Sequence, residues 1–146
     1  IESHGMQRMV RYHKGIQKGT IHPEAKPEVV FETPISAVID GHNGMGQLIS
    51  IYAMKKAIEK AKTTGVGIVS VRNSNHFGIA GYYAKMAVAW AVSVYFAAFP
   101  DEMLTYLQDG HKLDEFTYKK SLQKITESYR VDKEMKKIIK EMRQRG

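Results

Sequence analysis

A short apolar run that leads straight into a polar loop constrains the fold of this chain more than any other feature. Residues 66–71 read Val-Gly-Ile-Val-Ser-Val, a β-branched stretch bounded by glycine and typical of a buried strand. The loop 73–78 follows with small polar residues, one histidine and one glycine, and residues 79–84 can open a helix. Because α/β proteins tend to hold ligands where a strand ends and a helix begins, we expect a functional site here.

His76 is the candidate catalytic residue of this loop. Imidazole is the side chain best suited to exchanging a proton near neutral pH, so it can serve as a general acid or base. The alternative is a loop histidine that bonds a backbone carbonyl, and the position of His76 alone does not decide between the two.

The segment before this junction predicts two strands and a helix. Residues 28–32 lie between two prolines, and residues 36–40 form a second apolar stretch, so both are candidate strands. A helix is then predicted up to Gly65, its C-cap, because apolar residues recur at spacings of three and four. The order is strand, strand, helix, strand, helix, which predicts α/β or α+β, with a small mixed sheet and flanking helices. The apolar positions are Leu48, Ile51, Met54, Ile58 and Ala61.

The glycine-rich stretch 41–46 has two interpretations. It lacks the lysine and hydroxyl residue of a P-loop, and its glycine spacing differs from that of a dinucleotide fingerprint. Its backbone nitrogens could still face an anion at the start of the helix. We favour a turn that needs positive φ angles.

The end of the chain predicts a separate helical part. Residues 1–99 form the expected α/β core, and residues 100–146 the expected amphipathic helical tail. Asp132 is a candidate cap for the last helix. Isolated helices of this length are marginal in water, so we expect the tail to pack on the rest of the chain or on a second copy. One apolar stripe comprises Tyr118, Leu122, Ile125 and Tyr129, and the other Met135, Ile138, Ile139 and Met142.

Composition excludes several classes of protein. A hydrophobic fraction of 43% is too high for a disordered chain, and the absence of cysteine excludes disulfides and thiolate metal sites. The apolar run 88–99 is too short to span a bilayer, so we expect a buried strand or helix and no membrane role. The six histidines show no ligand spacing, and we predict no metal site. These features suit a cytoplasmic protein.

Four motifs occur in a fixed order along the first part of the chain. They are Ser3-His4-Gly5 with Arg8 and Tyr12, Glu32-Thr33-Pro34, Asp40 to Gln47, and Asn73 to Gly78. Together they resemble the type 2 malate/L-lactate dehydrogenase family, which includes the ureidoglycolate and sulfolactate dehydrogenases. No single motif is specific, but the ordered set is.

The resemblance implies an NAD(P)-dependent oxidoreductase that interconverts a 2-hydroxy acid and a 2-oxo acid, on a nucleotide-binding fold that is not a Rossmann fold. It implies that His76 donates the proton and that Arg8 holds the substrate carboxylate, while Ser3, His4 and Tyr12 line the same pocket. The chemistry agrees, because an imidazole can protonate the oxygen and a guanidinium can hold a carboxylate by two parallel hydrogen bonds.

The resemblance also implies NAD or NADP as cofactor, with Gly78 and Gly81 as candidate cofactor-binding residues, and a homodimer. It runs from about residue 1 to residue 87, and family members are more than twice as long as this chain. We therefore expect a truncated relative that lacks much of the dinucleotide pocket.

Two other functions stay open at this point. The chain could be a non-catalytic interaction or oligomerisation protein built on the inherited core. Its net charge of +7 and pI near 9.5 also raise the possibility of nucleic-acid binding. However, the charge is spread, and the motifs of zinc fingers and RNA-recognition sheets are absent, so we rank nucleic acid last. A small anionic substrate suits the same positive charge.

Overall fold

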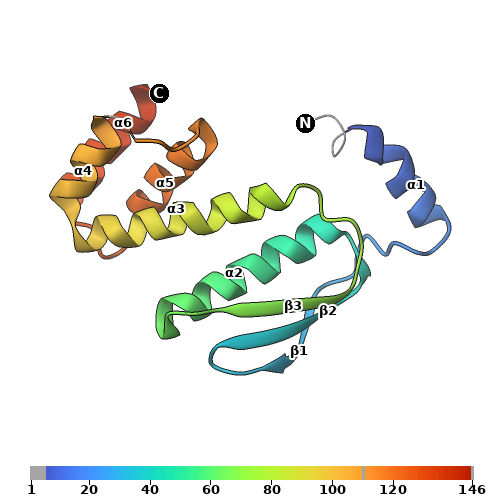
Figure 1. The fold of residues 1–146 in the computed structure, drawn as a ribbon. Coiled ribbons are helices and arrows are strands. Elements are labelled where there is room, and N and C mark those ends of the chain that lie inside the picture. Colours follow the sequence, from blue (N-terminus) through green and yellow to red (C-terminus); the bar gives the residue numbers. More distant parts are fainter. Residues whose placement is uncertain (1–5, 110, 146) are drawn as a thin grey trace. The chain divides into compact units, whose positions relative to one another are not determined.

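The computed structural model describes residues 6–109 and 111–145, and these fall into two compact units that divide between Tyr83 and Ala84 (Figure 1). The division lies inside helix α3 (Ala80–Ala98), a single helix that begins in the first unit and continues into the second. The predicted boundary at residue 99 coincides with the junction of α3 and the next helix. As the boundary between the α/β core and the helical tail, it stays a prediction.

The first unit is an α/β unit with three strands. A 3-10 helix (η2) leads into α1, two strands form a hairpin, and α2 connects the second strand to the third. The bounds are η2 Met6–Arg8, α1 Met9–Gln17, β1 Glu28–Glu32, β2 Ser36–Gly44, α2 Gly46–Thr64 and β3 Ile68–Ser74.

The sheet has the order β1-β2-β3 and is mixed, as predicted. β1 pairs with β2 in the antiparallel sense, and β2 pairs with β3 in the parallel sense after the crossover through α2. α2 packs on β2 and β3, and Gly65 ends it in the left-handed conformation expected of a C-cap, with φ of 83°. Because β2 and β3 are parallel, their carboxyl ends meet at one edge of the sheet.

The prediction that residues 66–71 form a buried strand is wrong in two respects. The strand begins two residues later, at Ile68, and its side chains are largely exposed. Ile68 is 58% exposed and Val71 is 36% exposed. The physical reason is its position, because β3 is an edge strand and α2 covers the sheet in this unit.

The glycine-rich stretch belongs to β2 and interrupts its pairing. β2 runs to Gly44, beyond the predicted end at residue 40, and its register with β3 shifts between Asp40 and Gly44. The positive φ angles that we expected in this turn occur at His42 (47°) and Asn43 (56°). Asparagine and histidine tolerate this left-handed region better than most non-glycine residues, which explains their presence here.

Glu32, at the end of β1, forms ion pairs with two lysines of α2. Its carboxylate lies 2.8 Å from the amine of Lys60 and 2.9 Å from that of Lys56. The hydrogen bond from Lys60, supported by that from Lys56, lowers the pKa of Glu32 from 4.5 to about 2. This ionic contact ties the end of β1 to α2.

We expect this contact to make stability depend on pH. Because the pKa of Glu32 is lower in the folded chain than in the unfolded one, its contribution is complete above about pH 4.5 and is lost as the pH falls towards 2. The unfolding temperatures of the wild type and of Glu32→Gln, compared between pH 7 and pH 2, should converge at the acidic end. A matched Glu24→Gln variant alters an exposed glutamate and should stay parallel to the wild type. A constant difference between wild type and Glu32→Gln at all pH values would contradict the assignment.

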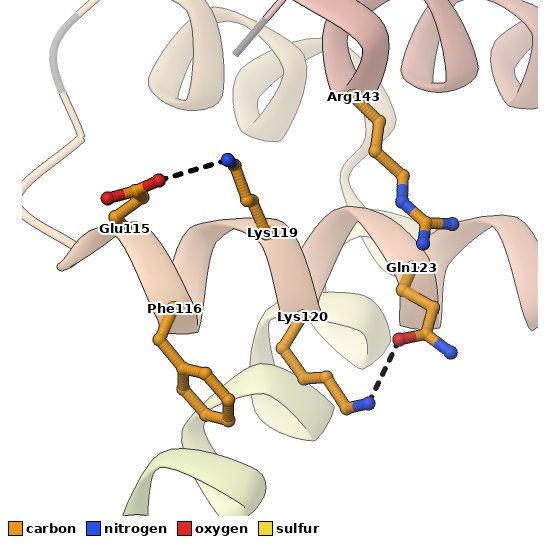
Figure 2. Close-up of a pocket in the computed structure, with 6 residues that line it drawn as sticks. All are labelled: Glu115, Phe116, Lys119, Lys120, Gln123 and Arg143. Carbon is orange, nitrogen blue, oxygen red and sulfur yellow. Dashed lines mark hydrogen bonds and ion pairs between the residues drawn. The ribbon is translucent and has the colours of Figure 1, made fainter.

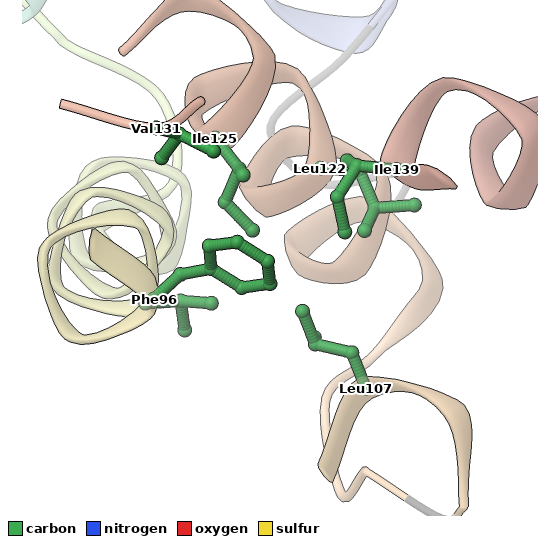
Figure 3. Close-up of a cluster of buried hydrophobic side chains, with 7 residues drawn as sticks. Phe96, Leu107, Leu122, Ile125, Val131 and Ile139 are labelled. Carbon is green, nitrogen blue, oxygen red and sulfur yellow. The ribbon is translucent and has the colours of Figure 1, made fainter. Parts of the chain in front are cut away.

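The second unit is a helical bundle around one apolar core. The part of α3 after Tyr83 packs with three helices, α4 Pro100–Gln108, α5 Glu115–Glu127 and α6 Lys133–Arg145. Phe96 of α3 is fully buried among side chains of the other segments (Figure 3). The buried members are Val92, Phe96, Leu107, Leu122, Ile125, Val131 and Ile139.

The helical tail is confirmed, with three corrections. Helix α4 was not predicted from the sequence, although Pro100 at its first turn followed by two acidic residues is a typical helix start. Tyr129 lies outside α5 and is 86% exposed, so it is not part of the buried stripe. Residues 88–99 bury one face of a helix, while Tyr95 on the other face is exposed.

Asp132 accepts a hydrogen bond from the backbone N–H of Met135, as predicted for a cap. Among the described residues, no helix has the length and apolarity needed to cross a bilayer.

Candidate functional site

Three side chains meet at the carboxyl ends of β2 and β3. Tyr12 comes from α1, Gln47 from the first turn of α2, and His76 from the loop that follows β3. The hydroxyl of Tyr12 lies 2.7 Å from Nδ1 of His76, and Nε2 of Gln47 donates to the same hydroxyl, also at 2.7 Å. All three side chains are half-buried. The site therefore lies at the edge of the sheet where α/β folds hold ligands.

The loop that carries His76 is held on both sides of this residue. Before it, the amide of Asn75 donates to the backbone carbonyls of Asn43 (2.8 Å) and Gly44 (3.1 Å) at the end of β2. After it, the hydroxyl of Tyr83 donates to the backbone carbonyl of Phe77. These contacts hold the backbone on both sides of His76 and do not involve its imidazole.

Gly46 allows this loop to approach α2 closely. A Cβ atom at this position would lie 2.1 Å from the carbonyl oxygen of Asn75 and 2.5 Å from that of His76. Both atoms are backbone, so no rotamer change could relieve the contact. The glycine is therefore needed for space, and a larger residue would displace the loop that carries the histidine.

Asp40 joins the ends of β2 and β3 beneath the site. Its buried carboxylate accepts hydrogen bonds from the backbone N–H of His42, from Nε of Arg72 and from the side-chain amide of Asn73, each at 2.9 Å. The backbone bond from His42, with those from Asn73 and Arg72, lowers the pKa of Asp40. The carboxylate thus stays ionised and keeps the two strand ends together.

The predicted site residues have different positions in the structure. Tyr12 and His76 lie within hydrogen-bonding distance of each other, and their roles stay predictions. Arg8 is half-buried and ends η2, one helical turn before Tyr12, so both side chains project from the same side of this helical segment. Ser3 and His4 lie outside the described residues. Their predicted roles, like that of Arg8, stay predictions.

The structure adds Gln47, Gly46 and Asp40 to the site. Gln47 ends one of the motifs that carry the resemblance, and Asp40 begins the same motif, but their partners are far away in the sequence. Periodicity does not reveal a contact of this kind. The glycine spacing did single out Gly46. Its role, however, is to let the loop that carries His76 approach α2 closely, and not to form part of a phosphate loop.

The comparison with known families gives a match over most of the chain. The sequence profile described as malate/L-lactate dehydrogenase matches residues 1–98. This range includes the whole candidate site and the sheet that positions it.

The chain belongs to the malate/L-lactate dehydrogenase family.

Relatives of known activity and structure support this membership. A malate dehydrogenase of Pyrococcus abyssi is 56% identical over 87 residues, which cover 60% of this chain and 24% of the relative. An L-sulfolactate dehydrogenase of Methanocaldococcus jannaschii is 49% identical over 86 residues, covering 59% and 25%. The structure of a malate dehydrogenase from Pyrococcus horikoshii OT3 matches with a TM-score of 0.57 and 55% identity, covering 60% of this chain and 25% of that one. The chain thus spans about a quarter of the length of these dehydrogenases.

A cavity lies in the helical unit, between α5 and α6. Its volume is about 470 Å³, and side chains from both helices line it (Figure 2). Two of its lysines already have partners, since Lys119 pairs with Glu115 at 2.9 Å and Lys120 donates to Gln123 at 2.9 Å. It lies outside the segment matched by the malate/L-lactate dehydrogenase family. We therefore do not assign it to the dehydrogenase site. The lining residues are Glu115, Phe116, Lys119, Lys120, Gln123 and Arg143.

Proposed function

We propose that the chain carries the substrate half of an NAD(P)-dependent 2-hydroxy acid dehydrogenase site. The observation that carries this proposal is the meeting of Tyr12, His76 and Gln47 at the carboxyl ends of the parallel strands. The relatives are named for malate, sulfolactate and diketogulonate, which are all acids with hydroxy or oxo groups. A small anionic 2-oxo or 2-hydroxy acid is the substrate class that this site would take.

His76 would handle the proton of the reaction, and Arg8 the substrate carboxylate. In the reduction of a 2-oxo acid, the carbonyl oxygen must gain a proton as its carbon gains a hydride. An imidazole held in a fixed loop is suited to give that proton, and in the reverse direction to receive it. The guanidinium of Arg8 would hold the carboxylate by two parallel bonds and so present the carbonyl to His76.

The described residues fit only part of a nicotinamide cofactor site. A bound cofactor would supply or accept the hydride. Gly78 and Gly81 leave space beside the backbone, since a Cβ atom would meet its nearest neighbours at 4.0 and 3.9 Å. They lie where α3 begins, and the free N–H groups of a helix N-terminus can receive a phosphate. We derive no step of the reaction from the cofactor itself.

The proposal is tested by following the oxidation of NADH and NADPH by the purified chain against a panel of 2-oxo acids. The panel should include monocarboxylic, dicarboxylic and sulfonated acids, because the relatives differ in this group. Turnover with at least one acid and one of the two nucleotides would support the proposal. A chain shown to be folded by circular dichroism that neither oxidises a nucleotide with any acid nor binds any acid in the absence of nucleotide would contradict it.

Replacing Arg8 by lysine should weaken substrate binding more than the chemical step. An ammonium group keeps the charge but cannot make the paired hydrogen bonds, and a lost bond to a charged group costs about 1.5 kcal/mol, or roughly tenfold in affinity. We therefore expect KM for the 2-oxo acid to rise about tenfold with little change in kcat.

Arg11→Lys is the matched control for this variant. Arg11 is an exposed arginine on α1, so the same chemical change there should leave KM unaltered. A KM equal to that of the wild type in Arg8→Lys, or an equal rise in both variants, would remove Arg8 from the carboxylate site.

A further inference from the structure

The hydroxyl of Tyr12 lies between two groups and has a single proton to donate. Nε2 of Gln47 lies 2.7 Å from this oxygen and is a donor only, so the oxygen accepts there. Its own proton must then point to Nδ1 of His76, the other atom at 2.7 Å. A nitrogen that accepts a hydrogen bond carries no proton, so in the neutral ring the proton is on Nε2.

We propose that Gln47 is a positioning residue that selects the Nε2–H tautomer of His76. It acts through Tyr12 and does not itself touch the imidazole. This inference rests on the proposed function for its catalytic meaning, but the tautomer is a property of the folded chain alone. Gln47 is thus the residue that directs the proton of His76 away from Tyr12.

The orientation of the Gln47 amide is decided by its other end. Oε1 is buried and has no hydrogen-bond partner among the residues that the structure describes. If the amide turned over, its NH2 group, with two protons, would take that unpartnered position. Buried N–H groups without partners are rarer than carbonyl oxygens with incomplete bonding, so the orientation with Nε2 towards Tyr12 is favoured.

This polarity suits a group that must give a proton to a 2-oxo acid. With Nδ1 occupied by Tyr12, the Nε2–H bond is the one that can point to a substrate oxygen. When that N–H bond breaks and a substrate O–H bond forms, Nδ1 can take the proton of Tyr12, so the ring stays neutral. The phenolate that remains on Tyr12 keeps the hydrogen bond from Nε2 of Gln47, which stabilises its charge.

The test is the tautomer of His76, read from the 15N signals of its ring in a labelled chain. The spectra are taken above the titration midpoint of His76 in each variant, so that the ring is neutral. In the wild type we expect Nε2 to carry the proton and Nδ1 to be the unprotonated nitrogen. A wild-type ring protonated at Nδ1 would overturn the inference.

Gln47→Glu reverses the polarity with almost no change of shape. A carboxylate only accepts, so it should draw the proton of Tyr12 towards itself and leave its oxygen to accept from His76. The expected result is a switch of His76 to the Nδ1–H tautomer. Gln47→Leu, which removes both groups, should give a mixture of tautomers. His13, exposed on α1, serves as the internal control and should be the same in all three chains.

The outcomes separate this inference from the proposed function. An unchanged Nε2–H tautomer in Gln47→Glu, in a chain with wild-type unfolding temperature, would overturn the role of Gln47 even if the chain turns over 2-oxo acids. A switched tautomer would support the role even if no turnover is found. Where turnover is present, the switch should also lower kcat for reduction and leave KM near its wild-type value, which a merely structural defect would not do.

Discussion

Turnover of a 2-oxo acid is expected to fall by about 10²–10⁴-fold when His76 is replaced by alanine, the range found for the loss of a general acid. The imidazole is the only side chain of its loop that can exchange a proton near neutral pH, and it lies at the strand ends where the substrate would bind. The backbone around it is held by Asn75 and Tyr83, so the fold should persist.

The measurement is kcat for oxidation of the reduced nucleotide at a saturating concentration of the best 2-oxo acid. His13→Ala removes an exposed histidine from α1 and is the matched control, expected to keep wild-type turnover. Unfolding temperatures of both variants should stay near that of the wild type. Wild-type kcat in His76→Ala would exclude this residue as the proton donor.

Gly46→Ala is expected to destabilise the first unit and to displace His76. Adding one methyl group places carbon 2.1 Å from the carbonyl oxygen of Asn75, well inside contact distance, so the loop must move. Overpacking of this kind costs about 1–3 kcal/mol and occasionally more. Replacing glycine by alanine in a helix gains no more than about 1 kcal/mol. The steric clash therefore outweighs the gain in helix propensity, and we expect the free energy of unfolding to fall by about 2 kcal/mol.

Gly81→Ala provides the opposite control for stability. Gly81 lies in the first turn of α3, and an added Cβ would have its nearest neighbour at 3.9 Å. This variant should be as stable as the wild type or slightly more so, in urea unfolding followed by circular dichroism. Gly46→Ala should also change the NMR signals of Tyr12 and His76, because their hydrogen bond depends on the loop. Equal stability of the two variants would contradict the close approach at Gly46.

Local patterns predicted much of the fold. Strand 28–32 lies between prolines and was predicted with its observed bounds, and Gly65 ends α2 as a left-handed C-cap. Both of these predictions depend only on residues that are neighbours in the sequence. The burial of β3 could not be read from its β-branched residues, because an edge strand and a central strand can share that composition. Leu48 fits the apolar spacing of α2 but is 63% exposed, because spacing alone does not show which positions of a helix meet the sheet.

The site was predicted through the order of its motifs more than through local chemistry. His76 and Tyr12 come from motifs far apart in the sequence, and the structure brings them within hydrogen-bonding distance. Gln47 could not be recognised in advance, because its role depends on which atom of its amide faces Tyr12. A glutamine in the first turn of a helix carries no sign of such a contact in its spacing.

Binding of a 2-oxo acid to the folded chain without any nucleotide, followed at the ring nitrogens of His76, tests the proposed substrate site most directly. If the carboxyl ends of β2 and β3 hold the acid against this residue, we expect a saturable change at Nε2 that Arg8→Ala weakens and that Arg11→Ala leaves unaltered. No change at His76 with any acid of the panel at millimolar concentration, or a change that Arg8→Ala and Arg11→Ala affect equally, would contradict it.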